Sequence, residues 1–231
     1  MDFVYICRDG DNEELRYSIR TVLHSFPEAN IWVVGNKPDW YSGKYVEVKQ
    51  DKHKYANAIN NLKTLCGVAE ISHNFVLMND DFFIIRKIEN IDQFYNGLLS
   101  EKIERFTKVT GSSSYIKKLA TTNHKLLKLG IKEPLDYELH TPMPMDKVGL
   151  LDVLTNYPEC LWRSMYGNIY NVGGTQMQDV KVYINRRHAD RAGQLADDSI
   201  YLSTEDAALN SMIDKILKHL VPEPSIYENK N

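Results

Sequence analysis

Three short apolar runs separated by helical segments are the feature that most constrains how this chain can fold. The runs are residues 3–7 (FVYIC), 31–34 (IWVV) and 75–79 (FVLMN), and residues 13–26 carry apolar side chains at helical spacing. Strands that alternate with helices predict βαβ units, and parallel strands covered on both faces consist of continuous apolar runs. We therefore predict an α/β fold with a mostly parallel central sheet, in which the carboxyl ends of the three strands lie on one rim.

The pattern changes after residue 86, where helical periodicity dominates. The clearest amphipathic segment is 203–220, for which Ser203 or Thr204 is the expected N-cap. A length of 231 residues without internal repeats favours one domain, with a Rossmann-like half at 1–86 and a largely helical half at 87–231. The other predicted elements are strands at 44–50 and 180–187 and helices at 54–71, 91–106, 114–130 and 145–157.

Composition and charge exclude several classes of protein. The formal net charge is −3, so no global basic field recruits nucleic acid or anionic membranes, and only a local basic patch stays open as an alternative. Cys7, Cys66 and Cys160 have no CxxC spacing, which argues against a disulfide framework and against a zinc site. No apolar run approaches 18 residues and the N-terminus lacks a basic region, so we expect no signal peptide, no membrane span and a cytoplasmic location.

Two adjacent acids, Asp80 and Asp81, end the third apolar run and are followed at once by Phe82 and Phe83. Ionised carboxylates cost several kcal/mol to bury without compensation. Ligands of open parallel sheets bind outside the carboxyl ends of the strands, where these acids lie. A divalent cation that also holds a diphosphate would offset the cost, because Mg²⁺ is bound by one or two carboxylates together with substrate phosphates. The alternative is that the acids cap the next segment or pair with Arg86.

Four segments of the chain resemble segments of one known family, in the same order. They are RDGDNEELRYSIRTVLHSFPEANIWVVGNKPDW, NAINNLKTLCGVAEISHNFVLMNDDFF, HTPMPMDKVGLLDVL with the later WRS, and YLSTEDAALNSMIDKILKHLVPEPSIYE. Together they extend over residues 4–228 and resemble the Stealth family, which includes capsular-polysaccharide sugar-phosphate transferases and N-acetylglucosamine-phosphotransferases. The chain departs from that family at Asn60, where an acid is usual, and it lacks a separate Val-Asp-Gly segment.

The resemblance implies a GT-A-like fold, a nucleotide-sugar donor (a UDP-sugar is favoured) and Mg²⁺ or Mn²⁺ on Asp80 and Asp81, with Asp81 also acting in catalysis. In a parallel sheet the loop after the first strand lies beside the loop of Asp80 and Asp81. A cluster on that loop and along the next helix is therefore predicted to approach the cleft that contains Asp80 and to bind the donor. Guanidinium groups at this place would suit a diphosphate. The alternative is a solvated helix that pairs its own acids and arginines. The cluster consists of Arg8, Asp9, Asn12, Arg16 and Arg20.

Two residues of the second half complete the predicted site. His140 lies in a loop stiffened by Pro142 and Pro144, and a histidine can take a proton from an attacking hydroxyl near neutral pH. Arg163 is predicted to contact the donor phosphates or the acceptor. The alternative interpretation of Arg163 is an ion pair at a helix end. A lone histidine is more often structural, so His140 is a catalytic candidate mainly because of the resemblance.

Three hypotheses follow from these observations. The first is a metal-dependent transferase that moves a sugar or a sugar-1-phosphate from a nucleotide sugar to a hydroxyl acceptor, such as a glycan. The second is a viral DNA glycosyltransferase acting on hydroxymethylated bases. Only one sequence feature supports it, the basic loop with Arg186, Arg187 and Arg191. The third is a nucleotide-sugar-binding module without turnover, which the departure at Asn60 permits.

Overall fold

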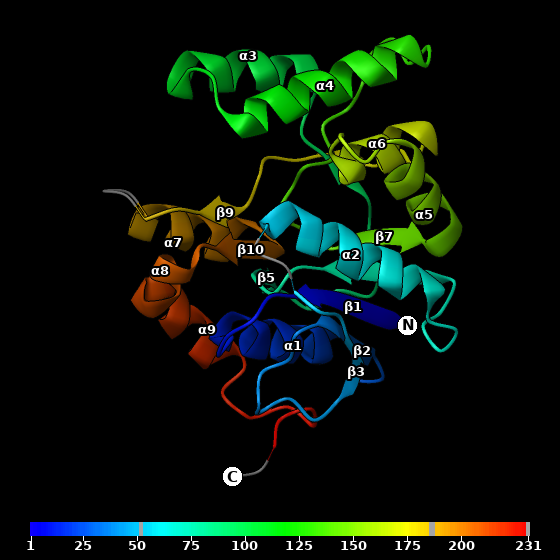
Figure 1. The fold of residues 1–231 in the computed structure, drawn as a ribbon. Helices are drawn as coiled ribbons and strands as arrows, with labels where there is room; N and C mark the ends of the chain where they lie inside the picture. Colours follow the sequence, from blue (N-terminus) through cyan, green and yellow to red (C-terminus); the bar gives the residue numbers. More distant parts are fainter. Residues whose placement is uncertain (51–52, 185–187, 230–231) are drawn as a thin grey trace. The chain divides into compact units, whose positions relative to one another are not determined.

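The computed structural model divides the chain into two compact units, and each is described by itself (Figure 1). The chain leaves the first unit after residue 91 and returns to it at 140–145 and again from residue 180, where a strand forms at Lys181–Val182 within the strand predicted at 180–187. The predicted division into two halves at residue 86 stays a prediction. The structure describes residues 1–50, 53–184 and 188–229, without the side chains of 110, 188, 189, 212 and 213; the first unit is 1–91, 140–145 and 180–231, and the second is 92–139 and 146–179.

The first unit is built on a five-stranded sheet in the order β3-β2-β1-β4-β7. The pairs β1–β2, β1–β4 and β2–β3 are parallel, so that Phe3 lies opposite both Ile31 and Val76. The three predicted strands thus share one sheet with their carboxyl ends on one rim, and the prediction of a mostly parallel sheet is confirmed. The strands are β1 (Asp2–Cys7), β2 (Asn30–Gly35), β3 (Lys44–Glu47), β4 (Asn74–Met78) and β7 (Met143–Asp146).

Two helices cover this sheet, α1 (Glu13–Ser25) and α2 (Lys54–Gly67), as predicted. They lie on opposite sides of β1 (Figure 1). This is the expected result of right-handed crossovers, because β1 leads to β2 on one side while β3 leads back past β1 to β4. Helix α1 begins after Asn12, whose side-chain oxygen accepts a hydrogen bond from the Leu15 N–H at 3.0 Å.

A second sheet of the first unit, in the order β5-β10-β9, holds the residues that follow the acidic pair. Strand β5 is at its edge, and α1 lies along β5 and supplies hydroxyl groups to its backbone. Ser18 Oγ donates to the Phe82 carbonyl, and the Ile84 N–H donates to Thr21 Oγ1 at 3.1 Å. The edge that lacks a strand partner is thereby satisfied. The strands are β5 (Phe82–Ile84), β9 (Lys181–Val182) and β10 (Tyr201–Thr204).

The prediction of one continuous helix over 203–220 is wrong. Ser203 and Thr204 are fully buried in β10, where they pair with β9, so strand pairing overrides their N-capping preference. The helical part is broken by Ser211, whose φ of −107° and ψ of −144° are not helical. Helix α7 (His188–Asp198) also forms where a basic loop was predicted. The broken segment consists of α8 (Asp206–Ala208), the π-helix η1 (Leu209–Ile213) and α9 (Asp214–Leu220).

The second unit is mainly helical, with a two-stranded ladder of β6 and β8. The helix predicted at 91–106 begins only at Leu99, because residues 94–95 form β6. A buried ion pair joins Lys102 and Asp136 at 2.8 Å. None of the helices in the described part of the chain is long and apolar enough to cross a membrane. The elements are β6 (Phe94–Tyr95), α3 (Leu99–Thr110), α4 (Ser114–Lys128), α5 (Lys147–Asn156), α6 (Trp162–Ile169) and β8 (Thr175–Gln176).

The C-terminal segment is fixed to α1 by one buried carboxylate, Glu228, whose side chain is 2% exposed. Arg20 donates to it at 2.8 and 2.6 Å, and Arg16 donates at 3.0 Å while its guanidinium lies 4.5 Å from the centre of the Trp40 ring. Burial opposes ionisation of Glu228, but hydrogen bonds from Arg20, from the Ser225 N–H and from Arg16 lower its pKa to about 2. Residues 225–229 are therefore held against α1 by charge.

Replacing Glu228→Gln should destabilise the protein by about 3 kcal/mol at pH 7, because two arginines lose their buried counter-ion. In the wild type this stabilisation is complete above the unfolded-state pKa near 4.5 and is lost as the pH falls toward 2. Urea denaturation at pH 7 and at pH 3 measures the effect. The variant should lose less stability than the wild type over this interval, and equal losses would contradict the assignment.

Candidate active site

The candidate site lies at the carboxyl ends of β1 and β4, which are neighbours in the central sheet. The strand order reverses at this point, since β2 and β3 lie on one side of β1 and β4 on the other. Crevices at such reversals are the usual ligand sites of open α/β sheets. The loop 8–12 follows β1, and Asp80 and Asp81 follow β4, so the two predicted groups of residues meet on this rim.

Asn12 joins the two loops. Its oxygen caps α1, and its amide nitrogen donates to Asp80 Oδ2 at 2.6 Å. One short side chain thus fixes both the start of the helix and the orientation of the carboxylate. The predicted approach of Asn12 to Asp80 is what the structure shows.

The two adjacent acids have different surroundings. Asp81 Oδ2 forms an ion pair with Lys181 Nζ at 2.5 Å and accepts a hydrogen bond from Ser203 Oγ at 3.0 Å. Asp80 has no lysine or arginine within ion-pair distance among the described residues, and Asn12 is its hydrogen-bond donor. Arg86, the pairing alternative considered from the sequence, donates instead to the carbonyls of Ala196 and Ser199.

An acidic cluster formed by Glu14, Asp80, Asp81 and Asp206 surrounds this rim. Glu14 is 4% exposed, and its Oε1 has no hydrogen-bond partner in the part of the chain that the structure describes. Burial, then the charges of Asp80, Asp206 and Asp81, raise the pKa of Glu14 to about 8. Burial and Asp81 also raise the pKa of Asp80. Arg8 offsets part of this charge, because its guanidinium pairs with Asp206 at 2.5 Å and holds the pKa of that carboxyl low.

The stability of two matched variants should separate the roles of the two acids. Asp81→Asn should cost about 3 kcal/mol, because the ammonium of Lys181 loses its partner in a largely buried place. Asp80→Asn should be neutral or stabilising in metal-free buffer, because it removes a charge that burial disfavours while the amide oxygen still accepts from Asn12. Denaturant titration at pH 7 measures both, and equal losses would contradict the asymmetry.

Glu14→Gln should change how stability depends on pH. In the wild type the folded-state pKa is raised, so the protein loses stability as the pH rises from the unfolded value near 4.5 through about 8. The variant should lack this loss and should be the more stable protein at pH 9, by an amount on the order of a few kcal/mol. Thermal denaturation at pH 5 and pH 9 tests this, and Glu70→Gln, an exposed acid before β4, is the control. A constant difference between wild type and variant at both pH values would refute it.

The other predicted donor residues have protein partners. Asp9 accepts a hydrogen bond from Asn36 Nδ2 at 2.6 Å, which keeps it on the rim after β1. Arg16 and Arg20 project from the face of α1 opposite Glu14, because the helical repeat places positions two and six residues after Glu14 on its far side. Both are engaged by Glu228, and Arg16 also pairs with Glu13 at 2.9 Å. The predicted approach of these two arginines to the Asp80 cleft therefore has no contact in its support.

His140 belongs to the first unit, and its ring lies edge-on to Phe82 with centroids 6.1 Å apart. Because Phe82 directly follows Asp81, His140 packs on the loop that carries the acidic pair. Arg163 belongs to the second unit, where it is 5% exposed and donates from Nε to the Tyr137 carbonyl at 3.2 Å. In the predicted basic loop, Arg186 and Arg187 lie outside the described residues.

The acids of the rim fit a magnesium or manganese ion only as a partial donor set. No group of three or more His, Cys, Asp and Glu side chains in the described residues is arranged to hold a metal. Asp80 Oδ1 accepts no hydrogen bond from the described residues, whereas Asp81 Oδ2 already accepts from Lys181 and Ser203. Magnesium is often bound by one or two carboxylates with the remaining positions given to water and phosphates, and Asp80 and Asp81 could supply these.

Four residues of the rim were missed by sequence reasoning: Glu14, Lys181, Ser203 and Asp206. Glu14 had a signal, because Glu14, Ser18, Thr21 and Ser25 form a polar stripe at helical spacing and all four are buried. No sequence signal indicates Lys181 or Ser203, because their contacts with Asp81 join residues that are 100 and 122 positions apart.

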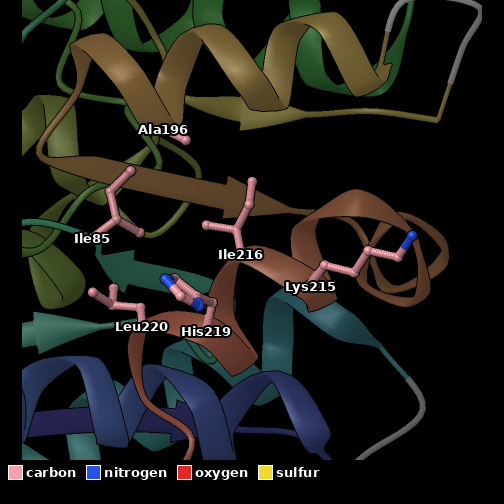
Figure 2. Close-up of a pocket in the computed structure, with 6 residues that line it drawn as sticks. All are labelled: Ile85, Ala196, Lys215, Ile216, His219 and Leu220. Atoms are coloured by element: carbon pink, nitrogen blue, oxygen red, sulfur yellow. The ribbon is translucent and has the colours of Figure 1, made fainter.

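Two cavities of about 370 Å³ open on the first unit, away from these acids. Figure 2 shows one of them, where Ile85, Ile216 and Leu220 gather beside the His219 ring while the Lys215 side chain extends away from them. The other is lined by the end of α1 and the segment 220–226. Neither is lined by Asp80, Asp81 or Glu14, so the cavities and the acidic rim are separate features.

Comparison with known proteins identifies the fold. No family model matches the sequence, and no curated protein matches it. The structure is similar to that of galactosyltransferase LgtC in complex with donor and acceptor sugar analogues, with a TM-score of 0.50, 10% identity and coverage of 97% of this chain and 98% of that chain. An active-site variant of LgtC gives a TM-score of 0.51 at 10% identity, with coverage of 97% and 96%. The expected GT-A-like fold is confirmed, and membership of the Stealth family stays a prediction.

Proposed function

We propose that this chain is a nucleotide-sugar-dependent glycosyltransferase. The observation that carries the proposal is the position of Asp80 at the carboxyl end of β4, held by Asn12 where the strand order reverses. The GT-A-like fold, shared with a galactosyltransferase, supports it. An acceptor hydroxyl on a glycan agrees with the absence of any wide basic field over the whole chain.

We further propose that the enzyme is metal-dependent, with Mg²⁺ or Mn²⁺ on Asp80 and Asp81. When bound, such an ion offsets the negative charge that develops on the leaving phosphate. The raised pKa of Asp80 supports this, because a half-buried carboxylate beside another acid gains most from a nearby cation. For Asp81 to take part, its carboxylate must be shared between the ion and Lys181.

The donor is expected to lie against the loop after β1. Arg8, Asp9 and Asn12 are placed there, and Arg8 can exchange its exposed pair with Asp206 for a donor phosphate at little cost, because exposed ion pairs contribute little. Arg16 and Arg20 keep Glu228 as their partner in this proposal. The role predicted for Arg163 stays a prediction, because this residue belongs to the second unit.

His140 is proposed to take the proton of the attacking hydroxyl. Its packing on Phe82 supports this role, because it brings the imidazole to the loop that carries Asp80 and Asp81. Attack at the anomeric carbon gives a glycoside, and attack at the β-phosphorus gives a sugar phosphodiester. The sequence resemblance to the Stealth family favours phosphorus, and the structural likeness to a galactosyltransferase favours carbon.

Nucleotide release from a panel of UDP-, GDP- and CMP-sugars tests the proposal. For a UDP-sugar, UDP release indicates glycosyl transfer and UMP release indicates sugar-phosphate transfer. Turnover should require Mg²⁺ or Mn²⁺, stop with a chelator, and fall at least a hundredfold in Asp80→Asn, which removes the charge that binds a hard cation. Glu70→Gln is the matched control and should retain full turnover.

Two results would overturn this assignment. Wild-type protein that binds donor but releases no nucleotide with any acceptor would indicate a binding module without turnover. Full turnover by Asp80→Asn would show that this carboxylate has no part in the chemistry, and the metal proposal would fail with it.

A further inference from the structure

Positive charge is concentrated in one stretch of this net acidic chain. Residues 105–132 contain seven lysines and arginines and no aspartate or glutamate, although the whole chain has a net charge of −3. The stretch covers the end of α3, the turn, α4 and the residues just after it. A surface with cations and no acids would attract a partner of the opposite charge.

Helix α4 turns this charge outward. It lies side by side with α3 in the second unit (Figure 1). Its buried side chains are Ile116, Leu119, Thr122 and Leu126, which share one face. Lys117, His124 and Lys128 are spaced by seven and four residues, so they lie together on the opposite face, and all three are exposed. Leu127 is exposed as well and lies on the flank between this face and the buried one. We call Lys117, His124, Lys128 and the flanking Leu127 the outer face of α4.

Large apolar side chains are exposed within the same stretch. Leu127 and Leu129 are each 46% exposed at the end of α4, and Val109 is 79% exposed at the end of α3. Leucines beside lysines on an exposed helix are the pattern of helices that lie in the interface of a bilayer, where apolar groups enter the acyl boundary and cations meet the headgroups. Nucleic acid would use the cations but give the leucines no partner.

The acids that flank the basic stretch in the sequence are not paired with the outer face of α4. Glu104, just before the stretch, pairs with Lys108 of α3 at 2.6 Å. Glu133, just after it, is exposed and forms no ion pair with the described residues. Lys117 and Lys128 have no carboxylate partner among the described residues.

We propose that the outer face of α4 is a docking surface for an anionic lipid bilayer, on which the protein lies without spanning it. Lys117 and Lys128 bind the headgroups, and Leu127 enters the boundary between headgroups and acyl chains. The surface belongs to the second unit and does not include the acidic rim, so this inference is independent of the proposed reaction.

Co-sedimentation of the full chain with vesicles tests the proposal. The protein should bind vesicles of phosphatidylglycerol mixed with phosphatidylcholine, and it should bind pure phosphatidylcholine at least tenfold more weakly. The double variant Lys117→Gln and Lys128→Gln should bind the anionic vesicles about 25-fold more weakly, since each cation contributes about fivefold near such a surface. Lys54→Gln with Lys63→Gln removes two exposed lysines of α2 and should bind as the wild type does.

Leu127→Gln distinguishes a bilayer from another polyanion. It leaves the charge unchanged and should weaken vesicle binding several-fold while leaving the low-salt affinity for duplex DNA unaltered. Tighter binding to duplex DNA than to anionic vesicles would overturn the proposal in favour of a nucleic-acid surface. Equal binding of wild type and the Lys117/Lys128 double variant to anionic vesicles would also overturn it. Nucleotide release with a soluble acceptor should not change in any of these variants.

Discussion

The site depends on the hydrogen bonds between hydroxyl groups of α1 and the backbone of β5. Strand β5 begins directly after Asp81, and it has a strand partner on only one side. Ser18 and Thr21 supply the missing partners, so the backbone that leaves the acidic pair is fixed to the helix that also carries Asn12 and Glu14. An unsatisfied buried N–H or carbonyl here would cost about 1–3 kcal/mol, and the loop would lose its position with it.

The buried carboxylates of the rim are compensated unequally, and this asymmetry bears on chemistry. Lys181 and Ser203 neutralise and orient Asp81, so this acid already has its partners without a ligand. Asp80 and Glu14 have none of comparable strength, and burial makes their ionised forms costly. A cation that enters the rim at Asp80 and Asp81 would offset the charge of Asp80 and of the nearby Glu14, while Lys181 and Ser203 keep the Asp81 side of the loop in place. The contacts of Asp81 thus hold the loop in a conformation in which Asp80 can bind a cation.

The sequence predicts the strands and the acidic pair but not the partners of that pair. Apolar runs such as 31–34 identify strands, because both faces of a covered parallel sheet are buried and nearly every side chain of such a strand is apolar. Local preference predicts a helix cap at Ser203 and Thr204, and only pairing with the distant strands β5 and β9 makes these residues part of a strand. Likewise nothing near Lys181 in the sequence indicates that it will neutralise Asp81, since the two meet only through the pairing of β9, β10 and β5.

Helix α1 explains how a short segment serves several purposes without conflict. Its stripe of Glu14, Ser18 and Thr21 faces the rim and β5, while Arg16 and Arg20 face the C-terminal segment through Glu228. The 3.6-residue repeat sets these two faces apart, so the arginines cannot neutralise Glu14 from within the same helix. The negative character of the rim is therefore a consequence of helix geometry and of the attachment of residues 225–229. Replacement of Glu228 by a neutral residue would leave Arg16 and Arg20 without their partner, but both would still lie on the face of α1 that points away from the acids.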